Sequence, residues 1–188
     1  VKEINSYKLD DTVTLVVLNG NYSESLSDKI ILKGLHINAL SNLDKEGKAR
    51  ISSQVDVESD AFIALNTVFS SNGFHLKIAK GESLQIPIHI LYVSESESEA
   101  IVNTRNLIEL GENAEATIIE EQLILGKGKV FTNYLSEKYV AQNAKLNCVL
   151  FQNEGAQGFS VNTNQVKVER DGHYDNTTIT LSGQLVRN

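Results

Sequence analysis

The chain has 188 residues with one cysteine and one proline, and a formal net charge of −7 at pH 7. This composition excludes an internal disulfide and a cysteine-rich metal site, and the acidic balance argues against nucleic acid, because phosphate contacts need clustered Lys and Arg. The longest apolar runs, such as residues 15–18, are far shorter than the roughly 20 residues that span a bilayer, so we expect a folded cytoplasmic protein without a membrane segment.

The first 73 residues predict strands and connectors that lead into a repetitive region. Residues 13–18 are β-branched and apolar, and Asn19-Gly20 follows them, which predicts a strand and a tight turn. A second apolar patch within residues 29–38 predicts one or two short strands. Residues 39–50 are richer in charge and are compatible with a short surface helix.

Residues 60–69 have a different periodicity. Asp60 is placed as an N-cap and Asn72-Gly73 as a stop signal, which predicts one amphipathic helix between them. The residues at helical spacing that form its expected apolar face are Phe62, Leu65, Val68 and Phe69. From Phe74 the period becomes that of a strand, because apolar and polar residues alternate.

From Gly81 onward the sequence repeats with a period of about thirty residues, which is typical of a solenoid. The rows begin at Gly81, Gly111 and Ala141, where we expect turns. The positions expected to face inward, row by row, are Leu84, Ile86 and Ile88, then Ala114, Ala116 and Ile118, then Ala144, Leu146 and Cys148. In the second half of each row, Ile101, Phe131 and Val161 form another expected column, and Asn103 stacks on Asn133.

Equivalent strands of successive rows must lie parallel and about 4.8 Å apart, which predicts a parallel β-helix. We expect a mainly all-β protein with one or two short helices in its N-terminal third, residues 1–73 leading into a solenoid core at residues 74–188. Antiparallel hairpins are the structural alternative, but they would not need stacked columns of like residues. The chain starts at Val1, has no Met and stops after an apparent strand, so we expect a fragment of a longer protein. Its open last coil, near residues 178–185, would allow self-association.

Outward carboxylates are the first candidates for chemistry. The best cluster is Glu120-Glu121, with Glu137 and residues 169–171 (Glu-Arg-Asp) on other rows. Two carboxylates act as an acid and base pair only within roughly 5–10 Å of each other across a groove, and neighbours on a strand point to opposite faces. A solvated surface is therefore the favoured interpretation of these residues.

The remaining candidates also favour structural roles. The histidines His36, His75, His89 and His173 lie in different rows without metal-site spacing, and His75 and His89 are expected to be partly buried in the walls. Cys148 lies in an inward column and is expected to be a small core residue. Residues 126–129 (Gly-Lys-Gly-Lys) lack the first Gly and the Ser/Thr of a phosphate loop and predict a turn. No catalytic, cofactor-binding or metal-binding residue is predicted.

Several short strings, taken in order over nearly the whole chain, carry a resemblance. They are residues 60–67 with Gly73-Phe74, 87–90, 105–108 with 111–114, 152–154 and 185–188. Together they resemble the SufD family of iron–sulfur cluster assembly proteins. The paralogous SufB typically continues the strand equivalent to residues 117–120 into a Gly-Cys-(Ser/Thr)-Ala-Pro motif, whereas this chain has Glu121-Gln122-Leu123-Ile124, which favours SufD.

The resemblance implies a right-handed β-helix and a complex with SufB and the ATPase SufC that builds clusters. It also implies longer family members whose SufC contact and interface histidine lie beyond Asn188, so no site residue transfers to this chain. We expect a non-enzymatic scaffold subunit with SufB-like and SufC-like partners, without a cofactor, and with neither nucleic acid nor a membrane as partner. There are two alternatives. One is a β-helical carbohydrate-active enzyme of the lyase or hydrolase type, which needs carboxylates that converge in a groove. The other is an adhesin, which needs a secretion signal.

Overall fold

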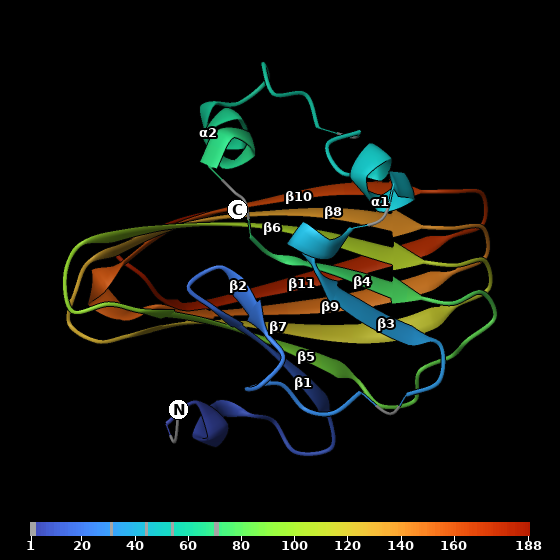
Figure 1. Ribbon diagram of the computed structural model, residues 1–188, viewed down its shortest axis with the longest axis horizontal. Helices are drawn as coiled ribbons and strands as arrows, with labels where there is room; N and C mark the ends of the chain where they lie inside the picture. The colour runs from blue at the N-terminus through green and yellow to red at the C-terminus, as the bar shows by residue number, and fades with distance from the viewer. Residues whose placement is uncertain (1–2, 31, 44, 54, 70–71) are drawn as a thin grey trace.

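The computed structural model describes residues 3–30, 32–43, 45–53, 55–69 and 72–188. The strands of the first wall, in spatial order, are β11 (His173–Ser182), β9 (Lys145–Asn153), β7 (Glu115–Leu125), β5 (Ile88–Glu95), β1 (Val13–Leu18) and β2 (Asn21–Ser23). Those of the second wall are β12 (Leu185–Arg187), β10 (Gly158–Val168), β8 (Val130–Val140), β6 (Ala100–Leu110), β4 (Phe74–Ile78) and β3 (Leu35–Ala39). From β4 onward the chain alternates between the walls, and these strands pair parallel within each wall, which confirms the parallel β-helix (Figure 1).

Antiparallel strands end the stack on its N-terminal side. Strand β1 begins and ends where the sequence predicts, and β2 returns beside it through Asn19 and Gly20, whose φ angles of 47° and 81° fit a tight hairpin turn. Strand β3 pairs antiparallel with β4 in the second wall. Of the apolar patch expected to hold one or two strands, only β3 is a strand among the described residues, and Ile31 lies outside them.

Short helices connect β3 to β4 on the outer side of the second wall (Figure 1). They are η2 (Leu40–Asn42), α1 (Lys45–Arg50) and α2 (Ala61–Phe69), while η1 (Ile4–Tyr7) and η3 (Gly155–Gln157) lie elsewhere in the chain. The helix compatible with residues 39–50 is therefore present as η2 and α1. None of the helices built from the described residues has the length and apolar character needed to cross a bilayer.

Helix α2 begins and ends where the sequence predicts, but it does not bury the predicted apolar face. Asp60 caps it, because its Oδ1 accepts a hydrogen bond from the Phe62 amide at 2.7 Å. Its buried residues are Ile63 and Asn66, whereas Val68 is largely exposed. The expected face is wrong because α2 lies on a sheet surface that offers backbone carbonyl groups as well as apolar side chains, and a polar residue occupies the centre of the contact.

The coils follow the predicted period in the middle of the stack but not at its ends. Ile88 pairs with Ile118 and Ile118 with Cys148, which confirms these inward columns. At the start of the stack, Ser83 bridges to Glu115, which is thirty-two residues further along the chain, so the first row holds two extra residues. The expected inward position of Ile86 is wrong, because this side chain is exposed. In the last coil Val130 pairs with Gly158, twenty-eight residues on.

The shortened last coil corrects a predicted column. Phe131 pairs with Ile101 and Phe159, whereas Val161 pairs with Asn133. This column faces outward, and Ile101 is exposed. The stack of Asn103 on Asn133 is confirmed, since Asn133 Nδ2 donates to Asn103 Oδ1 at 3.1 Å.

One turn position per coil adopts a left-handed backbone conformation. Gly81, Asn113, Asn143 and Asp171 have φ angles of 75°, 57°, 58° and 57°. The turns thus lie near the expected places, but in two of them the residue with the left-handed conformation is Asn113 or Asn143, two positions after Gly111 or Ala141. Asn and Asp take this conformation more readily than most residues, because their short polar side chains bond locally.

Candidate functional site

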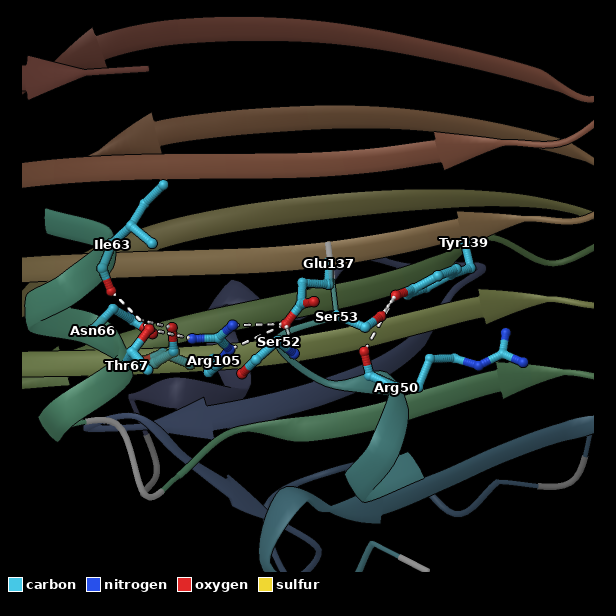
Figure 2. A network of polar contacts seen from close by, with 10 residues as sticks. Arg50, Ser52, Ser53, Ile63, Asn66, Thr67, Arg105, Glu137 and Tyr139 are labelled. Atoms are coloured by element: carbon cyan, nitrogen blue, oxygen red, sulfur yellow. Dashed lines mark hydrogen bonds and ion pairs between the residues drawn. The ribbon is translucent and has the colours of Figure 1, made fainter. Parts of the chain in front are cut away.

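A buried ion pair lies on the outer face of the second wall, under the segment that connects β3 to β4 (Figure 2). Arg105 of β6 donates from Nε and Nη2 to Glu137 Oε1 of β8 at 3.1 and 2.9 Å. Their side chains are 4% and 0% exposed. The Ser52 amide donates to the same oxygen at 2.8 Å, and Arg105 Nη1 donates to Thr67 Oγ1 at 2.9 Å. The pair therefore joins two coils to α2 and to the chain after α1.

Asparagine side chains hold α2 beside this pair. Asn66 Nδ2 donates to the carbonyl oxygens of Thr104 and Asn133 at 3.1 and 2.8 Å. In return, Asn133 Nδ2 donates to the Phe62 carbonyl at 2.9 Å. A side-chain amide at the centre of a helix contact is unusual, and here it takes part in bonds to backbone groups of two coils.

A second group of charges lines a groove of about 790 Å³ between α1 and the turns of the second wall. Glu109 accepts from His75 Nε2 at 2.6 Å and pairs with Arg50 at 2.8 Å. Burial raises the pKa of Glu109, but the hydrogen bond from His75 and the charge on Arg50 outweigh it, so the pKa is lowered. The other charged residues that line the groove are Glu46, Lys77, Lys80, Glu112, Lys167 and Glu169. Among these, Lys80 pairs with Glu112 and Lys167 with Glu169.

Substitution of Glu109 by glutamine is expected to flatten the acid side of the stability profile. Because the folded-state pKa of Glu109 lies below the ordinary 4.5, its carboxylate stabilises the fold above that pH, and this contribution is lost as the pH falls below it. Glu109→Gln should lower the free energy of unfolding by roughly 1–3 kcal/mol at pH 7, with a smaller further loss below about pH 4.5 than the parent shows. Urea unfolding across pH measures this. Glu112→Gln, on an exposed pair, is the control, and equal acid losses in Glu109→Gln and parent would contradict the assignment.

A third charged group lies inside the β-helix. Lys138 Nζ of β8 lies 2.8 Å from Glu120 Oε1 of β7, and the two side chains are 1% and 9% exposed. Tyr92 donates from its hydroxyl to Glu120 Oε2 at 3.1 Å, and Asn106 Nδ2 donates to the Tyr92 hydroxyl at 2.9 Å. Burial lowers the pKa of Lys138, but the charge on Glu120 outweighs it, so the pKa is raised and the lysine stays charged.

The structure corrects the solvated-surface interpretation for two of the carboxylates. Glu120 points into the lumen because alternate residues of β7 face inward, as Ala116 and Ile118 do. Glu137 faces outward, but the segment between α1 and α2 covers it. Glu121, on the opposite face from Glu120, lies 3.3 Å from His89 Nε2.

The other candidates lie in the predicted surroundings, except that His89 is more deeply buried than expected. Glu169, Arg170 and Asp171 are exposed, as expected of a solvated turn. His89 is fully buried and His75 partly buried in the walls, while His36 and His173 are exposed. Within the part of the chain that the structure describes, no group of three or more His, Cys, Asp or Glu side chains is arranged to hold a metal ion. Residues 126–129 form the predicted turn, with Gly126 at a φ of 89°.

Cys148 is a core residue, as its column predicts. It is buried in the main apolar cluster, and Lys138 Nζ lies 3.8 Å from its sulfur. Burial raises the pKa of the thiol to about 11, although the charge on Lys138 opposes this. The thiol is therefore protonated and enclosed, which suits neither a nucleophile nor a metal ligand.

Cys148 is accordingly expected to resist alkylation in the native protein. At pH 8, its reaction with iodoacetamide should be more than about 100-fold slower than that of an exposed thiol, because both the thiolate fraction and access are small. Mass spectrometry over time measures the rate. Thr177→Cys in a Cys148→Ser background supplies the exposed control, and urea should bring Cys148 to the same rate. Rapid native labelling would contradict the buried assignment.

Sequence reasoning missed the basic partners of the buried carboxylates. Arg105 and Lys138 were not singled out, although each lies in a strand whose alternation was readable. For Lys138 the available signal was its inward position two residues before Val140, but the partner of each residue lies on another strand and is not marked in the sequence.

Comparison with known proteins places this arrangement in a family. Residues 92–188, just over half of the chain, match the family described as "SUF system FeS cluster assembly, SufBD core domain". The chain is 24% identical over 180 residues to "Iron-sulfur cluster assembly protein SufD" of Escherichia coli (strain K12), covering 94% of this chain and 41% of that protein.

Two further relatives show the same partial coverage. The chain is 23% identical over 186 residues to "Iron-sulfur cluster assembly SufBD family protein slr0076" of Synechocystis sp., covering 92% of the chain and 41% of the relative. It is 25% identical over 184 residues to "Protein ABCI7, chloroplastic" of Arabidopsis thaliana, with coverage of 92% and 38%. The chain therefore spans about two fifths of the length of the curated relatives it matches. The matched residues form the parallel coils from β6 to β12, together with the second half of β5, and the chain belongs to the SufBD core domain family.

Proposed function

We propose that the protein containing this chain is a non-enzymatic scaffold subunit of the Suf iron–sulfur cluster assembly complex, and that it pairs with SufB-like and SufC-like subunits. The observation that carries the proposal is the match of residues 92–188 to the SufBD core domain. The names of two relatives, SufD of Escherichia coli and slr0076 of Synechocystis, include iron–sulfur cluster assembly, which supports the same role.

The architecture supports a scaffold on physical grounds. Strands β5 to β10 are each hydrogen-bonded to a neighbour on both edges, so a coil cannot move without breaking two ladders. The buried pairs of Arg105 with Glu137 and Lys138 with Glu120 add links between strands. A stack of this kind holds its two ends at a fixed separation and rotation, which is the property needed to position partner subunits.

The groove lined by Glu109 is where the carbohydrate-active enzyme of the alternative would place its catalytic carboxyl groups. That alternative needs one carboxyl group with a raised pKa to act as a general acid. The pKa of Glu109 is lowered instead, and its carboxylate is occupied by His75 and Arg50. Lys80 and Lys167 likewise pair with Glu112 and Glu169. Burial raises the pKa of Glu154, but this carboxyl group is 1% exposed and does not line the groove, so the groove favours the scaffold over the enzyme.

Co-purification tests the proposal directly. The tagged full-length protein, co-expressed with SufB-like and SufC-like subunits of the same organism, is expected to retain both and to elute with them as one complex. Each of the three proteins expressed alone provides the reference elution volume. A full-length protein that elutes alone in the presence of both subunits would overturn the pairing. Release of reducing or unsaturated sugars from a polysaccharide panel would overturn the non-enzymatic assignment.

A further inference from the structure

The lumen between the two walls has an apolar half and a polar half. Toward the turns that contain Asn113 and Asn143, the inward residues are apolar, such as Ile118 and Leu110. Toward the other end of the same strands they are polar, such as Gln122. The polar half is the part of the interior that the proposed function does not use.

This polar half contains several hydrogen-bonded groups, one of which is the pair of Thr132 and Glu154. Two further groups are larger. The first is the group of Lys138, Glu120, Tyr92 and Asn106 described above. In the second, Gln122 Nε2 donates to Asn162 Oδ1 at 2.5 Å and Gln152 Nε2 donates to Gln122 Oε1 at 3.2 Å. The second group continues to the last strands through bonds of Gln152 with Thr180 and Asn188.

A small cavity separates the two groups and is lined by members of both. Its volume is about 10 Å³, and its lining includes Tyr92, Asn106, Glu120, Gln122 and Asn162. Asn106 is 1% exposed and Asn162 is 6% exposed. Among the described residues, neither Asn106 Oδ1 nor Asn162 Nδ2 has a hydrogen-bond partner. One of these atoms is an acceptor and the other is a donor.

We propose that this cavity is a binding site for one ordered water molecule, which donates to Asn106 Oδ1 and accepts from Asn162 Nδ2. The volume corresponds to about one water-sized probe, and buried waters typically satisfy polar groups that lack protein partners. A buried amide atom without a hydrogen-bond partner destabilises the fold, so occupancy of the cavity by water is favoured.

The charges around the cavity select a neutral ligand. The Glu120 carboxylate in the lining disfavours an anion, and the Asn162 donor, with the Lys138 ammonium behind Glu120, disfavours a cation. Rotation of the Asn162 amide would present its oxygen to the cavity, but it would place two donors, Asn162 Nδ2 and Gln122 Nε2, against each other. The bond from Gln122 therefore assigns the Asn162 amide the orientation that directs its donor into the cavity.

The water joins the two groups into one polar column across the lumen. The joined column runs from Tyr92 on β5 to Thr180 on β11 and includes residues of both walls. A slip of one coil by one residue would turn its polar member outward and break the column, because side chains alternate between faces. The site is thus inferred to fix the register of the coils against one another.

Two measurements on the full-length protein test the site. A crystal structure at a resolution that shows ordered waters is expected to contain one water within hydrogen-bonding distance of Asn106 Oδ1 and Asn162 Nδ2. In solution, the Asn162 side-chain amide protons should show a nuclear Overhauser effect to a long-lived water. An empty cavity, or a direct bond between Asn106 and Asn162, would overturn the proposal.

A double-mutant cycle provides an independent readout. Asn106→Leu and Asn162→Leu each remove one partner of the water, so the shift in urea midpoint of the double variant is expected to be smaller than the sum of the two single shifts. Asn38→Leu, exposed on β3, is the control partner and should combine additively with Asn162→Leu. Additive shifts for the Asn106 and Asn162 pair would count against a shared water. If a variant does not fold, the crystal structure and the nuclear Overhauser measurement on the unsubstituted protein still test the water site.

Discussion

Replacement of Glu137 by alanine is expected to lower the free energy of unfolding by about 3–5 kcal/mol, because it leaves a buried arginine without its counter-charge. Arg105 is 4% exposed and donates two of its hydrogen bonds to Glu137. The Ser52 amide also loses its acceptor. Urea unfolding followed by circular dichroism measures the change. Glu112→Ala, which breaks an exposed pair with Lys80, is the matched control and should change stability by less than about 1 kcal/mol.

The double variant Arg105→Met/Glu137→Met distinguishes two causes of lost stability: the loss of the ion pair itself, and the burial of an arginine without a counter-charge. It is expected to be more stable than Glu137→Ala, because removing both charges leaves no uncompensated ion in the buried contact. Hydrogen exchange should show α2 amides losing protection in Glu137→Ala while β7 and β9 amides keep theirs, since the pair attaches α2 to the wall. A Glu137→Ala protein within about 1 kcal/mol of the parent would contradict this account.

Lys138→Met is expected to have an effect of similar size inside the lumen, about 3–5 kcal/mol of lost stability. The substitution keeps the approximate shape of the side chain, but among the described residues it leaves the Glu120 carboxylate with only the Tyr92 hydroxyl as a hydrogen-bond partner. Unfolding in urea at pH 7 measures the loss. Lys167→Met, on an exposed pair with Glu169, is the control for the same chemical change at the surface.

Restoring neutrality should recover part of that stability. Lys138→Met/Glu120→Gln contains no buried charge at this place and keeps an amide that bonds to the Tyr92 hydroxyl. We expect it to be more stable than Lys138→Met alone. A double variant that is less stable than Lys138→Met would show that the interior depends on the charged pair rather than on charge balance.

Features set by backbone geometry and short-range chemistry were predictable from the sequence. The Asp60 cap, the strand at residues 13–18 and the Asn19-Gly20 turn were all found where expected. The inward position of Cys148 also followed from alternation along a strand. In each case the determining contacts lie within a few residues, so the local sequence contains the whole signal.

The ion pairs show what the same reasoning does not reach. Glu120 and Glu137 were both interpreted as solvated. Alternation with Ala116 and Ile118 already placed Glu120 in the lumen, whereas Glu137 faces outward and is covered by a distant segment. Whether a carboxylate is exposed depends on which strands and helices lie above it. No local pattern in residues 120 or 137 encodes the approach of Lys138 or Ser52.

The sequence by itself determined that the chain forms stacked parallel coils, because a period near thirty with inward apolar positions buries those positions only when rows stack. Only the tertiary structure decided the two-residue difference of the first and last coils, the face of α2 that contacts the wall and the carboxylates that are buried. The physical reason is that alternation along a strand and the repeat period mark only which positions are apolar. Register, covering and charge pairing arise between segments that are tens of residues apart.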